Sequence, residues 1–327
     1  ATDGSVTGVA KVKDLPIAEY DTESNTIRKI EYKIEETEIP EYYNIPDAQV
    51  IIPADGQKNV VFKNTLKSGG IKVIKKAEVN GSTKIIPLAG VEFRLTNNYN
   101  KTVLTETTDK NGELQFNNLP IAVGTLDKDG NETVRKIRYT ISEVAGDKNK
   151  NYVLADDRTI TLDYEETKKI NSLEIINKPI TGNIYLEKAD SINNELLSGA
   201  EFTLYNDVNG NGKYDESTDT VANGYVLSTD DEGKTTYIPS SIMIENTTLT
   251  TDDDGNETTV GTGRYELNNI PKGKYVIVET ASPVGYVKEK KEFAFEITTD
   301  EETLHIYEKD GKPIVDHSTD DNHFVHN

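Results

Sequence analysis

Short runs of alternating apolar and polar residues, separated by turns rich in Asn, Asp and Gly, extend along the whole chain. The clearest runs are rich in Val, Ile, Thr or Tyr and cover residues 71–75, 139–143 and 275–279. Alternation with a period of two residues is typical of strands with one buried face. No segment keeps a 3.6-residue apolar period over the length of a helix. The pattern therefore predicts an all-β protein with little helix.

The same motifs return three times along the chain. The motif Tyr-x-Ile-x-Glu follows a Leu-Pro or Ile-Pro turn each time and ends in Glu36, Glu143 and Glu279. An apolar-x-Asn strand end comes later in each copy, at Asn64, Asn177 and Asn327. Two copies also begin with a strand ending in lysine, at Lys75 and Lys188. These repeats predict domains at residues 1–68, 69–181 and 182–327, the last with an insertion near 234–262.

The first repeat has no lysine strand and no Gly-x-Glu-Phe segment ahead of its other motifs. It therefore looks like the C-terminal half of a domain. We expect its front half to be a cleaved N-terminal segment, or a strand that a neighbouring chain adds.

The insertion in the third repeat is predicted to form either an extra hairpin or a contact surface for a neighbouring subunit.

Composition excludes several function classes. The formal net charge is −21, which disfavours nucleic acid because phosphate binding needs clustered Lys and Arg. The chain has no cysteine, so disulfides and thiolate chemistry are excluded, and its four histidines give poor support for a zinc centre. No apolar run approaches the roughly 20 residues of a membrane helix, so we expect no membrane insertion.

Alternation along the strands places one Lys, one Glu and one Asn of each complete repeat on the apolar faces. One explanation is a buried Lys–Glu ion pair with an Asn hydrogen bond, or a register that leaves all three exposed. The other is a covalent amide. Burial lowers the pKa of a lysine and raises that of a glutamate, so a neutral amine can attack the Asn carbonyl beside a protonated acid, with loss of ammonia. Two complete sets in the same order favour the covalent explanation.

Residues 275–286 (Tyr-Val-Ile-Val-Glu-Thr-Ala-Ser-Pro-Val-Gly-Tyr) are similar to the E-box of Gram-positive pilins. Together with Lys188, residues 199–202 (Gly-Ala-Glu-Phe) and Asn327, they resemble the collagen-adhesin B-type domain (Cna B-type, SpaA-like). The second repeat resembles it through Lys75, residues 87–93 (Pro-Leu-Ala-Gly-Val-Glu-Phe), Glu143 and Asn177, although Val-Ala-Gly follows Glu143 where the family has Thr-x-x-Pro.

The resemblance implies tandem immunoglobulin-like antiparallel sandwiches arranged end to end, in a secreted sortase substrate on the cell wall or pilus of a Gram-positive bacterium. It also implies self-formed isopeptide bonds Lys75–Asn177, promoted by Glu143, and Lys188–Asn327, promoted by Glu279. Glu36 and Asn64 would belong to a third set. The chain contains no Tyr-Pro-Lys pilin motif and no sorting signal, and we expect a sorting signal to follow it.

We therefore expect a structural cell-surface protein, either a pilus shaft subunit or an adhesin stalk, whose partners are other pilin or surface subunits. The alternative is an adhesin whose domains bind a host protein or glycan directly. We expect no enzyme activity beyond single-turnover self-crosslinking, and no required cofactor.

One loop of the third repeat resembles a calcium loop. Asp207, Asn209, Asn211 and Asp215 occupy positions 1, 3, 5 and 9, with Gly at position 6. Position 12 is Thr218, where such loops carry Glu. The loop is therefore predicted either to bind calcium weakly or to be a solvated Asn/Gly hairpin turn.

Overall fold

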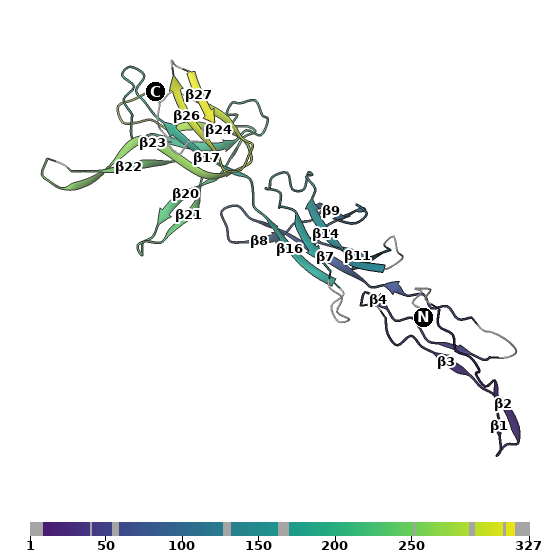
Figure 1. The fold of residues 1–327 in the computed structure, drawn as a ribbon. Coiled ribbons are helices and arrows are strands. Elements are labelled where there is room, and N and C mark those ends of the chain that lie inside the picture. Colours follow the sequence, from purple (N-terminus) through teal and green to yellow (C-terminus); the bar gives the residue numbers. More distant parts are fainter. Residues whose placement is uncertain are drawn as a thin grey trace. The chain divides into compact units, whose positions relative to one another are not determined.

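The computed structural model describes residues 9–39, 41–53, 59–126, 132–162, 170–251, 253–287, 292–309 and 312–317. All regular structure in these ranges is β-strand (Figure 1), which confirms the predicted all-β class. The same ranges hold no helix long and apolar enough to cross a membrane. The chain divides into two compact units. The first is Ala1–Ile74, Ala89–Val144 and Asp156–Glu174, and the second is Lys75–Leu88, Ala145–Ala155 and Ile175–Asn327.

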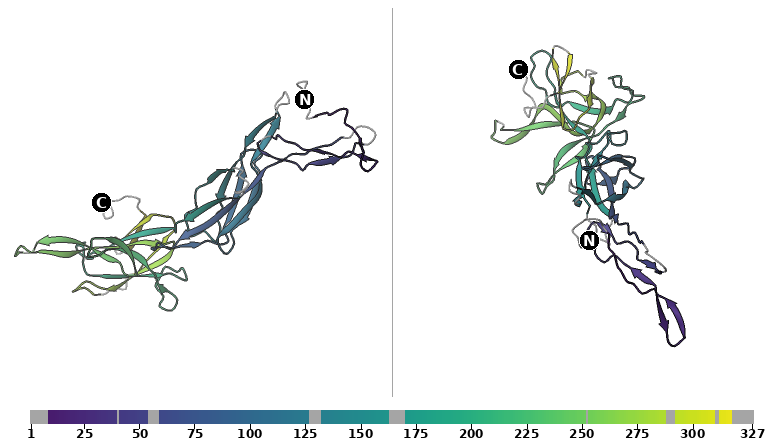
Figure 2. Two further views of the ribbon diagram at one scale, coloured as in Figure 1. Left: turned by 90° about the horizontal axis from the view of Figure 1, so that it is seen from below. Right: turned by 45° about the vertical axis from the view of Figure 1, so that its right-hand side comes forward.

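The first six strands of the first unit are short and pair two by two: β1 with β2, β3 with β5 and β4 with β6 (Figure 2). They are β1 (Ala18–Asp21), β2 (Thr26–Lys29), β3 (Tyr32–Ile34), β4 (Tyr43–Asn44), β5 (Gln49–Ile51) and β6 (Thr65–Leu66). Among the described residues ahead of Ile71, Pro53 is the only one with an apolar side chain that is buried. This part of the chain therefore has paired strands without a closed core.

The second repeat forms two larger sheets, with strand orders β10-β9-β14-β15 and β11-β7-β16. Strand β8 pairs with β7, and β12 pairs with β13. The bounds are β7 (Ser68–Glu78), β8 (Ile85–Pro87), β9 (Glu92–Asn97), β10 (Val103–Thr107), β11 (Glu113–Pro120), β12 (Ala122–Leu126), β13 (Glu132–Lys136), β14 (Arg138–Glu143), β15 (Arg158–Thr161) and β16 (Ile170–Asn177).

Both sheets of the second repeat contribute to its core. Ile71 and Val73 of β7, Phe93 of β9, and Tyr139 and Ile141 of β14 are all buried. These side chains alternate with more exposed ones along each strand. The alternation confirms that each of these three strands buries one face, as its sequence predicts.

The third repeat lies in the second unit and also has two sheets. One has the order β21-β20-β23-β17-β26-β27, with β22 also pairing with β23, and the other has the order β19-β18-β24-β25. The bounds are β17 (Thr181–Glu187), β18 (Glu201–Asn206), β19 (Thr220–Val221), β20 (Gly224–Thr229), β21 (Thr235–Ser240), β22 (Ile244–Thr251), β23 (Glu257–Pro271), β24 (Gly273–Ala281), β25 (Glu292–Ile297), β26 (Glu302–Lys309) and β27 (Lys312–His317).

One hydrophobic cluster joins the two sheets of the third repeat. Ile184 and Leu186 of β17 belong to the same buried cluster as Phe202 of β18 and Ile277 of β24. The two sheets therefore form a sandwich. Strand β17 pairs with β26 in parallel, which the expectation of purely antiparallel sheets did not include.

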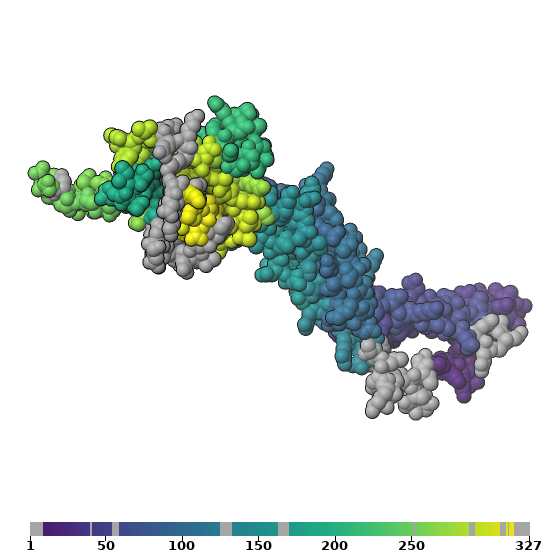
Figure 3. Space-filling view, turned by 90° about the horizontal axis from the view of Figure 1, so that it is seen from above, coloured from purple at the N-terminus to yellow at the C-terminus, as the bar shows by residue number. Residues whose placement is uncertain are grey.

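The insertion of the third repeat forms strands. Strand β20 pairs with β21, and β22 pairs with β23, both antiparallel. In Figure 3 the tip of the β22–β23 hairpin, in green, projects beyond the rest of its unit. Of the two predictions for this segment, the structure contains the extra hairpin.

Candidate functional site

In the second repeat, the predicted lysine and asparagine lie next to each other. Lys75 is on β7 and Asn177 is the last residue of β16, the neighbouring strand of the same sheet. The Lys75 Nζ donates a hydrogen bond to Asn177 Oδ1. Lys75 is 0% exposed and Asn177 is 1% exposed. Burial of a lysine is rare in proteins, and here it places the amine against a side-chain carbonyl.

In the third repeat, the predicted lysine meets the glutamate. Lys188 follows the end of β17 and Glu279 lies on β24, so the pair bridges the two sheets of the sandwich. The distance from Lys188 Nζ to Glu279 Oε2 is 3.0 Å. The side chain of Glu279 is 1% exposed, and its Oε1 is buried without a hydrogen-bond partner among the described residues.

Asn327, the predicted third member of that set, lies outside the described residues. Strand β26 lies beside β17, and their pairing extends to Leu186 and Ile306. Lys188 comes two residues after this pairing ends. The pairing of β26 with β17 thus does not include the position of the lysine.

In the first repeat, the glutamate and the asparagine lie together. Asn64 Nδ2 donates a hydrogen bond to Glu36 Oε1 at 3.0 Å. Glu36 Oε2 is buried and has no hydrogen-bond partner in the described part of the chain. Both side chains are half-buried.

The three repeats together contain every pairing of the predicted triad: Lys with Asn, Lys with Glu, and Asn with Glu. In the first and third repeats, one carboxylate oxygen of the glutamate bonds to a partner. The other oxygen is buried and has no hydrogen-bond partner among the described residues. Glu143 is the remaining member. It ends β14, on the same face as the buried Tyr139 and Ile141, and is half-buried.

A tyrosine fixes the glutamate strand in each repeat, a role that the sequence motifs did not reveal. The hydroxyl groups of Tyr32, Tyr139 and Tyr275 donate to the backbone carbonyls of Pro16, Pro120 and Pro271 at 2.8, 2.7 and 2.7 Å. Burial raises the pKa of Tyr139 and of Tyr275 to about 12. Each glutamate lies four residues after its tyrosine. Glu143 and Glu279 are on the same strand as their tyrosines, and Glu36 lies two residues beyond the end of β3, so the bond sets the position of the segment that carries each glutamate.

The proline carbonyl that accepts this bond follows a residue with a positive φ angle. Asp14, Asn118 and Asn269 stand two residues before the three prolines and have φ angles of 58°, 54° and 50°. Asn and Asp adopt this left-handed conformation more readily than other residues with a side chain. In the second and third repeats this residue and the proline lie at the end of a strand, β11 and β23, and the strand register shifts there, as it does at a β-bulge.

The oxygens of the predicted calcium loop accept hydrogen bonds from the backbone of the loop itself. Asp207 accepts from the amides of Asn211 and Gly212, and Asn211 Oδ1 accepts from Lys213. Hydrogen bonds from Ser217 lower the pKa of Asp215. No cluster of three acidic or histidine side chains suited to a metal occurs among the described residues. This geometry fits a solvated turn better than a metal site, and calcium binding stays a prediction.

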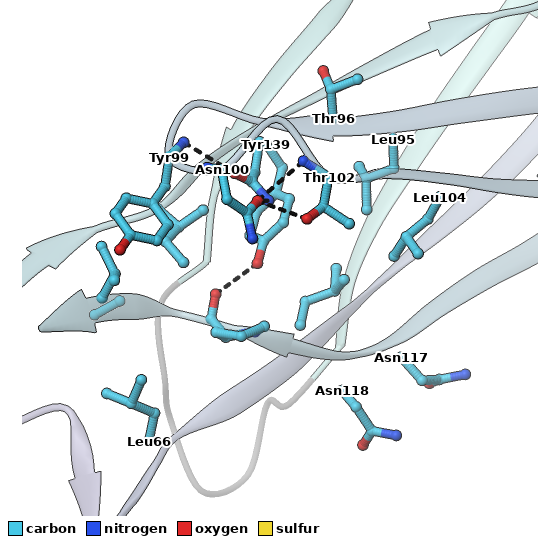
Figure 4. Close-up of a pocket in the computed structure, with 16 residues that line it drawn as sticks. Leu66, Leu95, Thr96, Tyr99, Asn100, Thr102, Leu104, Asn117, Asn118 and Tyr139 are labelled. Atoms are coloured by element: carbon cyan, nitrogen blue, oxygen red, sulfur yellow. Dashed lines mark hydrogen bonds between the residues drawn. The ribbon is translucent and has the colours of Figure 1, made fainter.

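A pocket of about 340 Å³ lies in the first unit (Figure 4). Four of its polar side chains bond to one another or to the backbone: Asn97 donates to Asn100, Asn100 Oδ1 accepts from Thr102, and Tyr139 donates to Pro120. The lining residues are Leu66, Leu95, Thr96, Asn97, Tyr99, Asn100, Thr102, Leu104, Asn117, Asn118, Leu119, Pro120, Ala122, Val123, Ile137 and Tyr139.

One family model matches part of the chain. Residues 182–312 match the model of the SpaA family, described as a prealbumin-like fold domain. No curated protein matches the chain.

Among solved structures, the chain is similar to the shaft pilin SpaA of Lactobacillus rhamnosus GG, at 20% identity, covering 74% of this chain and 97% of that one, with a TM-score of 0.27. It is also similar to the TIE protein of Bacillus anthracis, at 21% identity, covering 81% and 52%, with a TM-score of 0.32. The minor pilin GBS52 of Streptococcus agalactiae is 18% identical, with 73% and 94% covered and a TM-score of 0.27.

Proposed function

We propose that this chain is part of a structural protein of the Gram-positive cell surface, a pilus subunit or an adhesin stalk. Its sandwiches are closed by isopeptide bonds that they form themselves. The bonds are Lys75–Asn177, promoted by Glu143, and Lys188–Asn327, promoted by Glu279. The observation that carries the proposal is the buried contact between Lys75 Nζ and Asn177 Oδ1. The SpaA-family match of residues 182–312 supports the assignment.

The contacts between these side chains suit a condensation of the lysine amine with the asparagine carboxamide. The uncharged lysine amine attacks Cγ of the asparagine, and the glutamic acid gives a proton to the carboxamide oxygen as the C–N bond forms. The C–N bond to the original amide nitrogen then breaks, and that nitrogen leaves as ammonia after taking up the one proton that the lysine nitrogen loses, while the proton on the oxygen returns to the glutamate. The carboxyl group is regenerated, and no external reactant is consumed. The buried amine becomes part of an amide that cannot take up a proton, so no cost of burying a lysine charge remains.

The reaction has a structural consequence. In the second repeat it would close a loop between residues 102 positions apart, joining strands β7 and β16. Tension applied at the ends of the two strands would then act on a covalent bond. A chain without cysteine would gain a permanent cross-link. This suits a load-bearing extracellular protein, because an amide, unlike a disulfide, cannot be reduced.

Intact mass of the denatured protein tests the proposal. We expect a mass below the sequence mass by two ammonias. Lys75→Ala and Glu279→Ala should each restore one ammonia. Lys72→Ala is the matched control: it is on the same strand but pairs with Glu113 at 2.8 Å, and it should leave both losses unchanged. A wild-type mass equal to the sequence mass would leave only the noncovalent contacts and contradict the proposal.

The alternative, an adhesin that binds a host protein or glycan through these domains, has no comparable observation behind it. The pocket of the first unit is a candidate binding site, and three of its polar side chains, Asn97, Asn100 and Thr102, bond to one another. We therefore keep the structural role as the proposed function.

A further inference from the structure

Strand β22 is an open sheet edge on a hairpin that projects from its unit. Among the described residues it pairs with β23 along one edge and with no strand along the other. Figure 3 shows the hairpin, in green, standing clear of the rest of the unit. A two-stranded ribbon without a core is marginally stable in water, and its open edge can pair with a strand of another molecule. The free edge of β22 is therefore accessible to an incoming strand.

The outer part of β22 lacks the features that keep the other sheet edges of the third repeat from pairing. Residues 246–251 contain no charged residue and no proline. The edge strands β25 and β27 both contain charged residues, β21 contains Pro239, and β19 is only two residues long. Charges, prolines and short strands are the usual means by which an edge avoids pairing with another chain. Residues 246–251 of β22 have none of them.

The exposed part of β22 reads the same in both directions. Residues 247–251 are Thr-Thr-Leu-Thr-Thr, and all five are exposed, with Leu249 at 62%. When two copies pair antiparallel about a two-fold axis at Leu249, the two leucines meet on the axis. Thr248 then faces Thr250 of the second copy, and the outer threonines face each other in the same way. Cross-strand threonines stabilise a sheet by hydrogen bonding, and the leucines bury apolar area against each other.

Charge decides the direction of such a pairing. The chain has a formal net charge of −21, so two copies repel each other and approach most easily through a segment without charge. Asp253 and Asp254 come just after β22. Parallel pairing would place these acidic residues of the two copies side by side, which is destabilising. Antiparallel pairing places them at opposite ends of the contact.

We propose that β22 is a self-association site, at which two copies of this chain pair their β22 strands antiparallel about Leu249. The two hairpins would then form one four-stranded sheet. The contact involves five residues of each strand, against the roughly 20–30 residues a side of a stable interface. The dimer is therefore weak in solution, and it becomes stronger where copies are held close together. Added salt also strengthens it, because salt screens the repulsion between the acidic chains.

A single introduced cysteine tests the pairing about Leu249, because the chain has no cysteine of its own. A residue on a two-fold axis meets its own copy, so Leu249→Cys should give a disulfide-linked dimer under mild oxidation. It should form at least about tenfold faster than with Thr259→Cys, which lies opposite Leu249 on β23 and thus one strand further from the second copy. Equal rates would indicate random collision, and a faster reaction of Thr248→Cys would indicate a different register. Either result overturns the proposal.

Added lysines test the strand contact itself. In the Leu249→Cys background, Thr248→Lys with Thr250→Lys places lysines opposite each other across the contact, and it should slow dimer formation at least about tenfold. Thr258→Lys with Val260→Lys is the matched control, because it adds the same charge at the positions directly opposite on β23. The control should not slow the reaction, since it lowers the net repulsion between the two acidic chains. Equal slowing by both pairs overturns the proposal.

Sedimentation equilibrium of the unmodified chain measures the association without a cross-link. We expect the fraction of dimer to rise with protein concentration and with salt. Leu249→Lys should abolish the dimer, whereas Leu227→Lys, the same change at an exposed leucine of β20, should not. A wild-type chain that stays monomeric up to about 1 mM overturns the proposal. These outcomes leave the proposed isopeptide bonds untouched, because those bonds are read from the mass of the chain.

Discussion

At the scale of single residues, the hydrogen bonds that the glutamate carboxylates make, and those that they leave unmade, indicate how the triad works. Glu279 holds Lys188 through Oε2 and leaves Oε1 buried without a partner among the described residues. Glu36 holds Asn64 through Oε1 and leaves Oε2 in the same condition. Each open oxygen corresponds to the triad member that the described part of its repeat does not supply. A carboxyl group whose one oxygen is bonded and whose other oxygen is available can hold an amine and a carboxamide together while they react.

The raised pKa values of the buried tyrosines predict how the free energy of unfolding depends on pH. Burial raises the pKa of Tyr139, Tyr265 and Tyr275 to about 12, from 10.0 for an ordinary tyrosine. Between these values the unfolded chain releases the protons and the folded chain keeps them. The stabilisation is therefore complete below pH 10 and is lost as the pH rises through 12. Each tyrosine should remove up to about 1.4 kcal/mol of unfolding free energy per pH unit.

Denaturant unfolding at a series of alkaline pH values measures this slope. Tyr275→Phe should make it shallower by the share of one tyrosine, and Tyr237→Phe, which removes a hydroxyl from a half-exposed ring, is the control. An unfolding free energy that stays constant across this pH range would contradict the assignment.

At the scale of elements, the left-handed residue two positions before each proline is the repeated feature. Asn269 has a φ of 50° and lies near the end of β23, beside the register shift between β17 and β23. This bulge places the Pro271 carbonyl where it accepts the hydrogen bond from the Tyr275 hydroxyl. It therefore helps to position β24 and, with it, Glu279.

Asn269→Ala should destabilise the third repeat by about 1 kcal/mol, because alanine is strained in the left-handed region. Asn269→Gly is the matched control and should cost less, because glycine adopts this conformation freely. Thermal or chemical unfolding compares the two variants. Equal stability of the alanine and glycine variants would show that the positive φ carries no cost.

The strands also show which features of the fold could be predicted from the sequence. Alternation and repeated spacing predicted the strands, the buried face of each, and the contacts Lys75–Asn177 and Lys188–Glu279, because a period of two residues fixes which side chains share a face. The spacing could not predict the tyrosine–proline hydrogen bonds, because they depend on the β-bulge that brings the proline carbonyl within reach of the tyrosine hydroxyl. The parallel pairing of β17 with β26 was also missed, because these strands are more than 100 residues apart and local pattern does not encode their neighbours.

At the scale of the whole molecule, the proposed bonds would contribute stability that a chain without disulfides otherwise lacks. By the chain-entropy model, closing a loop of about 100 residues contributes roughly 4.7 kcal/mol. A typical domain has a total stability of about 5–15 kcal/mol. The contribution of the proposed cross-link in the second repeat, which would span 102 residues, would therefore be comparable to the total stability of a typical domain.

Glu143→Gln tests this contribution while keeping both bonding residues in place. It should lower the unfolding free energy of the second repeat by roughly 4–5 kcal/mol, because the loop stays open. Glu113→Gln, which removes only the partly exposed pair with Lys72, is the control and should cost less than about 1 kcal/mol. If both variants unfold alike, either the bond does not form or it does not stabilise the fold.

Peptide mapping tests the central claim most directly. The denatured wild-type protein is digested with a protease, and its fragments are sequenced by tandem mass spectrometry. We predict two branched peptides, one joining Lys75 to Asn177 and one joining Lys188 to Asn327, each lighter than the sum of its parts by one ammonia. Recovery of both lysines and both asparagines only in linear, unmodified peptides would contradict the account.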